Sequence, residues 1–169
     1  MRKWFVAQTQ PGKETLAESH LRRQNFQIFL PLYRKTITHA RRTQEVLRPL
    51  FPGYIFVSLD VEKDQWFSIN GTRGVTHLLT QGDSKPLFVP DGIVDTLQKE
   101  QEEQGAIALG SLANAFKTGD TIRVTEGAFA EHIGTIEALT DKDRVQLLLN
   151  FMNRPLEISI PLTSLEKLD

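Results

Sequence analysis

Residues 49–57, with the sequence PLFPGYIFV, are predicted to form a rigid turn that leads directly into a strand. The two prolines fix their own φ angles and favour extended geometry in the residues before them, and the β-branched and aromatic residues that follow favour a strand. In such a strand Ile55 and Val57 share one face, while Tyr54 and Phe56 share the other, so both faces are apolar. Either two layers of one domain cover both faces, or the aromatic face is open for a partner.

The composition is that of an ordinary globular protein with room for one domain or two small ones. The chain has 169 residues, of which 40% are hydrophobic and 24% charged. It contains no cysteine, which excludes disulfides, thiolate zinc sites and cysteine nucleophiles. There is no apolar run long enough to cross a bilayer, and the start does not resemble a signal peptide. We therefore expect a cytoplasmic protein without a membrane partner.

The net charge of −1 conceals an asymmetry between the two ends of the chain. Residues 1–50 hold ten lysines and arginines against three acids, whereas residues 101–169 hold six against eleven. This distribution either reflects ordinary solvated surface or indicates a first half that faces a polyanion.

The first half of the chain alternates between strand and helix patterns. A polar, basic span from Ile37 to Val46 is predicted to form a hairpin tip. Asp91 is expected to cap the last helix, which contains Ile93, Val94 and Leu97. Strands are predicted at Lys3–Thr9, Phe26–Tyr33, Tyr54–Leu59, Val75–Leu79 and Pro86–Val89, and further helices at Lys13–Gln24 and Val61–Asn70. This order predicts a ferredoxin-like α+β sandwich with one added helix.

The pattern changes after residue 98. Residues 99–115 are small and polar without a strong period, as in a linker, although Ala106–Leu112 has some capacity to pack. Short strands are predicted at Thr121–Thr125, Ile133–Leu139, Arg144–Asn150, Leu156–Ile160 and near Leu165. They suggest a small SH3-like β-barrel over residues 116–169. The span 144–152 is equally compatible with a helix, because its leucines, Phe151 and Met152 could line one side of it.

Several stretches together resemble the NusG family of transcription elongation factors. The N-terminal domain of that family is resembled by Trp4-Phe5-Val6, by residues 49–57 and by Trp66-Phe67 followed by Gly71-Thr72-Arg73-Gly74-Val75. Its KOW domain is resembled by residues 119–129 (GDTIRVTEGAF), by Gly134 and by residues 145–150 (VQLLLN). The resemblance covers nearly the whole chain, and residues 70–77 and 148–150 are closer to the specialised RfaH-like paralogs. It implies domains at 1–98 and 116–169 joined by a linker at 99–115.

The resemblance implies an elongation and antitermination factor that suppresses pausing and acts as a monomer. Its aromatic face would dock on the clamp helices of the largest RNA polymerase subunit, as aromatic residues often anchor interfaces. The loop Gln65–Ser68 lies where relatives touch the opposite side of the cleft, although it lacks the threonines of RfaH. The implied polymerase-binding residues are Phe51, Pro52, Tyr54, Phe56, Trp66 and Phe67.

A second implied surface would face the exposed non-template DNA strand. Arginine pairs with phosphate or guanine, and histidine and threonine can hydrogen-bond to the base edges that a single strand exposes. For Arg73 and His20 the alternative is an ordinary surface side chain, and Gln10-Pro11 departs from the basic pair of RfaH. The implied DNA-binding residues are Gln10, Lys13, His20, Arg23, Thr72 and Arg73.

For the C-terminal domain the resemblance implies a partner-binding surface and a possible second fold. Phe129 and Ile133 would face ribosomal protein S10 and, in housekeeping members, termination factor Rho; alternatively they are barrel core. In RfaH this domain can form a helical hairpin that masks the aromatic face, locked by a glutamate–arginine pair. This chain has Arg48 and Arg144 at those places, and two like charges cannot form that lock. We therefore expect no autoinhibition through this pair. Whether a helical hairpin packs on the aromatic face through apolar contacts alone is left open by the sequence.

Catalysis has little support in the sequence, and no metal or cofactor is expected. Its four histidines, at positions 20, 39, 77 and 132, lack metal-ligand spacing, and no phosphate loop or nucleophile elbow is present. Two alternatives remain besides the elongation factor. One is an RNA-binding or ribosome-associated KOW protein, which would bind RNA tightly without polymerase. The other is an α+β enzyme without a recognisable motif.

Overall fold

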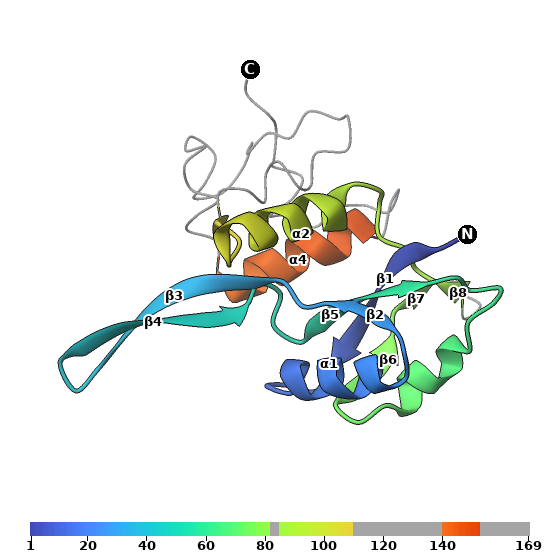
Figure 1. Cartoon of the computed structure of the whole chain (residues 1–169), viewed down its shortest axis with the longest axis horizontal. Coiled ribbons are helices and arrows are strands. Elements are labelled where there is room, and N and C mark those ends of the chain that lie inside the picture. Colours follow the sequence, from blue (N-terminus) through green and yellow to red (C-terminus); the bar gives the residue numbers. More distant parts are fainter. Residues whose placement is uncertain (82–84, 110–139, 153–169) are drawn as a thin grey trace, which may run out of the picture.

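The computed structural model describes residues 1–81, 85–109 and 140–152 of the chain. Figure 1 shows a central sheet with helices on both of its sides and a two-stranded arm that projects from the body. The strands are β1 (Lys3–Thr9), β2 (Gln27–Phe29), β3 (Leu32–His39), β4 (Arg42–Pro49), β5 (Tyr54–Leu59), β6 (Val75–Leu78), β7 (Thr80–Gln81) and β8 (Lys85–Pro86). The helices are α1 (Glu14–Arg23), the 3-10 helix η1 (Trp66–Gly71), α2 (Ile93–Gln104) and α4 (Asp141–Met152).

The main sheet has the strand order of a ferredoxin-like fold, which confirms the predicted fold class. Its order is β2-β5-β1-β6, and every neighbouring pair is antiparallel. The strand β5 lies between β2 and β1, and Phe5 pairs with Val57 in the register with β1. The predicted strand at residues 54–59 is therefore central to the sheet.

Two hydrophobic clusters cover the two faces of β5. On the side of α1, Ile55 and Val57 pack with Ala17 and Leu21 of the helix. On the other side, Phe56 belongs to a cluster with residues of α2 and α4, which lie together over that face (Figure 1). Covering both faces removes the apolar side chains of β5 from water, at about 25 cal/mol per Å² of buried area. Both faces of β5 are thus covered in this structure, and α4 contributes part of the cover on the aromatic side.

The predicted hairpin is confirmed, and it is formed by β3 and β4. Their register runs from Leu32 opposite Pro49 to His39 opposite Arg42. The two residues of the turn, Ala40 and Arg41, have φ angles of 51° and 66°. Positive φ at both central residues is what a type I′ turn requires, and this turn matches the right-handed twist of the strands that it joins.

Two local predictions in the first half were only partly right. The helix expected over 61–70 is restricted to η1, which begins at Trp66. The helix α2 begins after Gly92, which has a φ of 90°, and no side chain caps it, so the expected role of Asp91 is wrong. Of the strand expected at 86–89, Pro86 lies in β8 and Phe88 makes an isolated bridge to Phe5.

The region after residue 98 differs more from the prediction. Residues 99–104, expected in the linker, are the last turns of α2, and Ala106 and Ile107 beyond it are buried. Of the two alternatives left open for the span 144–152, a strand or a helix, the structure has the helix α4. The other strands predicted for the barrel lie outside the described residues. In the part of the chain that is described, no helix is long and apolar enough to cross a membrane.

Candidate protein and nucleic-acid interfaces

The aromatic side chains expected at a polymerase interface lie in the cluster between the sheet and α2 and α4. Phe51 and Phe56 are each only 1% exposed. The Phe56 ring lies edge-on to Phe51 and stacks on Phe29, with both centroids 6.0 Å from its own. The expectation that these rings point outward, uncovered by their own chain, is therefore wrong for this structure.

The cover over these rings comes from both halves of the chain. Ile93, Val94 and Leu97 of α2 are buried in the same cluster, and so is Leu148 of α4. Val145, one turn before Leu148, packs against the cluster as well. Because α4 lies in the region expected to form the C-terminal domain, the aromatic face is closed in part by a segment that follows it by about a hundred residues in the sequence.

A buried arginine fixes the beginning of α4 to the sheet domain. Arg144 is 2% exposed, and its Nε donates a hydrogen bond of 2.9 Å to the carbonyl oxygen of Leu50. Its guanidinium carbon lies 4.5 Å from the centroid of the Tyr33 ring, and its Nη2 forms an ion pair with Asp141. The Tyr33 hydroxyl lies 3.2 Å from the same carboxylate. These groups bind α4 through charge, a cation–π contact and a backbone carbonyl.

These contacts of Arg144 hold α4 in place of the glutamate–arginine pair of RfaH, whose positions are occupied here by Arg48 and Arg144. Arg48 is exposed on β4, and its positive charge cannot pair with that of Arg144. The sequence left helical packing over the aromatic face open, and in this structure the partners of Arg144 are Asp141 and Tyr33. The sequence signal for this is the three-residue spacing of Asp141 and Arg144, which places both on one side of a helix.

The remaining predicted polymerase-binding residues lie at the edge of the covered face or apart from it. Tyr54 and Pro52 are half-buried, and burial raises the pKa of the Tyr54 phenol above its ordinary value. The hydroxyl of Tyr54 therefore stays protonated at neutral pH and can donate a hydrogen bond. Trp66 is buried, whereas Phe67 is 70% exposed, and their ring centroids are 3.9 Å apart. Phe67 is thus an exposed aromatic side chain outside the cluster.

The structure brings most of the predicted DNA-binding residues to one surface, formed by the start of α1 and the loop before β6. The backbone N–H of Gln10 donates to the carbonyl oxygen of Gly74, at 2.8 Å. A Cβ on Gly74 would lie 3.0 Å from the backbone nitrogen of Ala17, so the loop lies directly against the helix. Gln10, Lys13 and Arg73 are all exposed around this contact.

The end of α1 joins the same surface through a glutamine that sequence reasoning missed. The side-chain nitrogen of Gln24 donates to the Thr72 hydroxyl at 2.7 Å and lies 3.4 Å from the His20 carbonyl oxygen. The Thr72 hydroxyl in turn donates to the carbonyl oxygen of Ser68, and Thr72 is 7% exposed. The Thr72 hydroxyl is thus used within the domain, and a contact of Thr72 with DNA stays a prediction. The four-residue spacing of His20 and Gln24 was the available signal.

Phe129 and Ile133, predicted to bind a partner of the KOW domain, lie outside the described residues. Within the described ranges no group of three or more histidine, aspartate and glutamate residues is placed to hold a metal ion.

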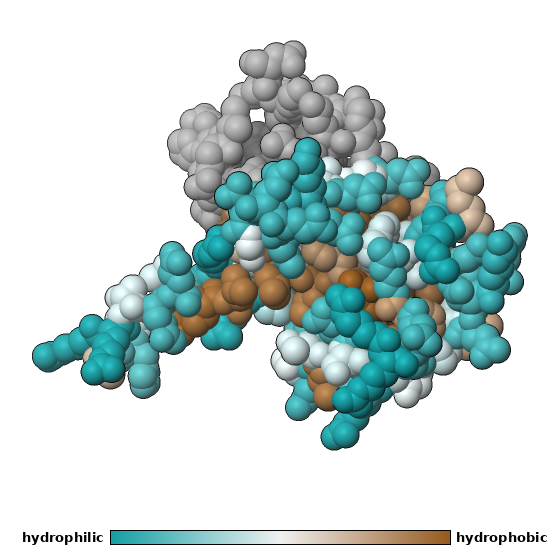
Figure 2. All heavy atoms as spheres, in the orientation of Figure 1, coloured by the Kyte–Doolittle hydropathy of each residue, from teal (hydrophilic) through white to brown (hydrophobic). Residues whose placement is uncertain are grey.

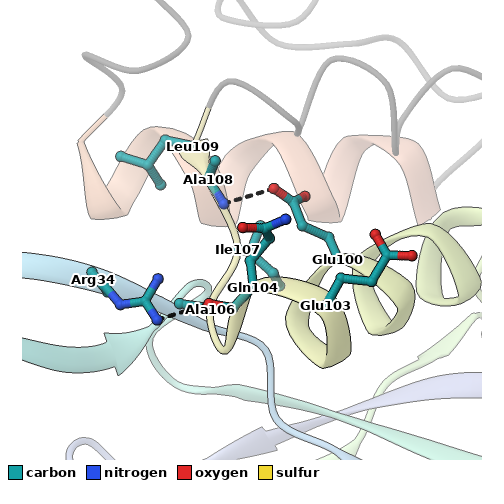
Figure 3. Close-up of a pocket in the computed structure, with 8 residues that line it drawn as sticks. All are labelled: Arg34, Glu100, Glu103, Gln104, Ala106, Ile107, Ala108 and Leu109. Carbon is teal, nitrogen blue, oxygen red and sulfur yellow. Dashed lines mark hydrogen bonds between the residues drawn. The ribbon is translucent and has the colours of Figure 1, made fainter.

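A pocket of about 540 Å³ lies apart from both surfaces, between β3, the end of α2 and residues 106–109 (Figure 3). Arg34 donates to the carbonyl oxygen of Gln104 at 2.7 Å, and Glu100 accepts a hydrogen bond of 3.0 Å from the Ala108 backbone. The first bond ties the end of α2 to β3, and the second ties residue 108 back to α2.

The exposed cations Lys13, Arg23 and Arg73 give the surface beside α1 a positive charge, as in proteins that bind a polyanion. A family model described as "Transcription termination factor nusG" matches residues 2–98. The NusG of Halalkalibacterium halodurans, named a transcription termination/antitermination protein, is 27% identical to this chain and covers 98% of both chains. The protein of the same name from Bacillus subtilis is 26% identical, again over 98% of each chain.

A solved structure described as "Domain interaction in Thermotoga maritima NusG" is also similar, with a TM-score of 0.41. It covers 78% of this chain and 76% of that chain at 19% identity. On the family match, this chain belongs to the NusG family, whose members are transcription factors and not enzymes. Its role is that of a transcription elongation factor.

Proposed function

We propose that this chain is an elongation and antitermination factor that docks its aromatic face on the clamp helices of the largest RNA polymerase subunit. At the same time, the surface beside α1 binds the exposed non-template DNA strand. The factor then suppresses pausing by keeping the polymerase cleft closed around the nucleic acid. The observation that carries this proposal is the cluster around Phe51 and Phe56, which a helix from the distant C-terminal region covers in part. An apolar face closed by a separable helix is suited to exchange that helix for another one.

The structure then corresponds to a closed state of the factor. For docking, α4 has to leave the face, and it gives up the contacts of Arg144 and Leu148 when it does so. A partner that binds only the open state shifts the population by its differential affinity. The helix α4 also supports our assignment to the RfaH-like paralogs, which the resemblance in residues 70–77 first suggested.

The domain limits and the other partners are part of the same proposal. Residues 1–98 form the polymerase-binding domain and residues 116–169 the KOW domain, while the linker of 99–115 begins as a continuation of α2. Once released, the KOW domain presents Phe129 and Ile133 to ribosomal protein S10 or Rho. The factor acts as a monomer in the cytoplasm.

Replacing Tyr54 with alanine is expected to weaken binding to core RNA polymerase about 30-fold or more. The physical reason is the loss of a half-buried aromatic anchor, which is worth roughly 2 kcal/mol at the centre of an interface. Binding is measured by titration of labelled polymerase, and pausing by an in vitro elongation assay. The matched control is Glu62→Ala, at an exposed position in the turn after β5. Unchanged binding by the Tyr54 variant would refute the docking assignment.

Removing the cations beside α1 is expected to lower the salt dependence of single-stranded DNA binding. Arg23 and Arg73 are both exposed, and each phosphate contact on a single strand contributes about 0.7 to the slope of log K against log salt. Arg23→Gln with Arg73→Gln should therefore reduce the slope by about 1.4. The control is Lys85→Gln with Lys99→Gln, which removes the same charge elsewhere. An equal reduction in both double variants would contradict a local DNA surface.

A further inference from the structure

The β3–β4 hairpin is a projecting arm that neither proposed surface uses. Between Arg34 and Arg48, every residue is exposed except Ile37 and Val46, which are half-buried. Figure 1 shows the arm extending from the body, and Figure 2 shows hydrophilic side chains gathered at its end and hydrophobic ones nearer the body.

The register of the arm determines which side chains share a face. Residues that lie opposite each other in an antiparallel pair point to the same side, and the side alternates at each step. One face therefore carries the pairs Lys35–Val46, Ile37–Gln44 and His39–Arg42, together with Arg48. The other face carries Arg34–Leu47, Thr36–Glu45 and Thr38–Thr43, and the hydroxyls of Thr38 and Thr43 lie 3.3 Å apart.

The charges of the arm are segregated between these faces. Lys35, Arg42 and Arg48 lie on the first face without a carboxylate, while Glu45, the only acid between residues 34 and 48, lies on the second. Within the described ranges, none of these three cations forms an ion pair. The first face, defined by Lys35, Ile37, His39, Arg42, Gln44 and Arg48, is called the basic face below.

Folding does not account for this segregation. Lys35 and Arg48 are diagonal neighbours of like charge on this face, and an isolated two-stranded hairpin is marginal in water. A carboxylate opposite Lys35 or Arg42 would stabilise the arm, yet Val46 and His39 stand there. Arg34 on the second face is used internally, since it donates to the Gln104 carbonyl oxygen.

We propose that the basic face of the hairpin binds the backbone of double-stranded DNA. Six residue steps separate the pair Tyr33–Arg48 from the pair His39–Arg42, which at about 3.4 Å per step is roughly 20 Å. That length spans about six base pairs of a duplex, and a two-stranded ribbon fits the major groove, which is about 12 Å wide. The exposed cations neutralise phosphates along one side of the ribbon. This surface is distinct from the one beside α1, to which a single strand is assigned above.

The test measures binding of the full chain to a labelled DNA duplex of about 20 base pairs by fluorescence anisotropy, over a series of salt concentrations. The triple variant Lys35→Gln, Arg42→Gln, Arg48→Gln is expected to lower the slope of log K against log salt by about 2.7, because each contact with B-DNA contributes about 0.9. The charge-matched control is Lys63→Gln, Lys85→Gln, Lys99→Gln, for which the slope is expected to stay unchanged. The single variant Arg42→Gln, beside the turn, should lower it by about 0.9.

Three results would overturn the proposal. The first is an equal loss in the triple variant and its charge-matched control, since only net charge would then matter. The second is an equal loss of single-stranded DNA binding in the triple variant, or tighter binding of double-stranded RNA than of the DNA duplex. The third is an unchanged slope in the variants. Far-ultraviolet circular dichroism checks the fold of the triple variant, and if that variant is unfolded, the Arg42→Gln result alone decides.

Discussion

The Phe56→Ala variant is expected to lose about 3–5 kcal/mol of unfolding free energy, the range for truncating a buried phenylalanine. The Phe56 ring is 1% exposed and contacts Phe29 and Phe51, so alanine leaves a cavity in the cluster beneath α2 and α4. The loss is measured by urea denaturation of the full chain, followed by circular dichroism.

Phe67→Ala is the matched control, since it removes the same side chain from a position that is 70% exposed. Its cost is expected to be about 0.5 kcal/mol. If Phe56→Ala cost no more than this control, the ring would not lie in the core. The comparison also affects polymerase assays: loss of binding by the Phe56 variant follows from unfolding, so Tyr54 is the residue that tests docking.

The Arg144→Met variant is expected to release α4 from the sheet domain without unfolding it. Methionine keeps much of the apolar stem but removes the cation–π contact with Tyr33, the ion pair with Asp141 and the hydrogen bond to Leu50. A buried carbonyl that loses its donor costs about 1–3 kcal/mol, and the cation–π contact adds about 0.5–2 kcal/mol. The exposed Asp141 adds little, because solvent screens the pair.

Hydrogen exchange of the backbone amides in residues 141–152 measures this release. A loss near 3 kcal/mol corresponds to exchange about 100-fold faster in α4, while β1 and β5 keep their protection. Lys142→Met, at an exposed position of the same helix, is the control and should leave exchange unchanged. Equal protection of α4 in both variants would show that Arg144 does not hold the helix.

The sequence predicts those elements of the fold in which apolar residues recur with a clear helical or strand period. The strands at 3–9 and 54–59 and the hairpin follow from alternation and turn chemistry, and the helix α1 from its apolar spacing. The span 144–152 has no such signal, because a run of three leucines fits a strand or a helix equally well. It is helical in this structure, where Leu148 packs in the same cluster as residues of α2.

The sequence predicts which types of residue form the candidate surfaces better than it predicts which of those residues are exposed. Arg73 and Lys13 are both exposed, and Gly74, which follows Arg73, lies against the backbone of Lys13. Thr72 and Phe56 are buried instead. Their burial depends on partners far away in the sequence, such as Gln24 for Thr72 and α4 for Phe56. The contact of Arg144 with Tyr33 joins residues more than a hundred positions apart, and local spacing carries no information about it.

The position of α4 after the sheet has a consequence during synthesis. The ribosome completes the strands and α2 by Gln104, but the cover ends only at Met152. At about 5–20 residues per second, the intervening 48 residues take roughly 2–10 s to translate. During that time the aromatic cluster of a nascent chain is covered by α2 but not by α4. Each new molecule is therefore prone to association through this apolar surface until α4 packs on it.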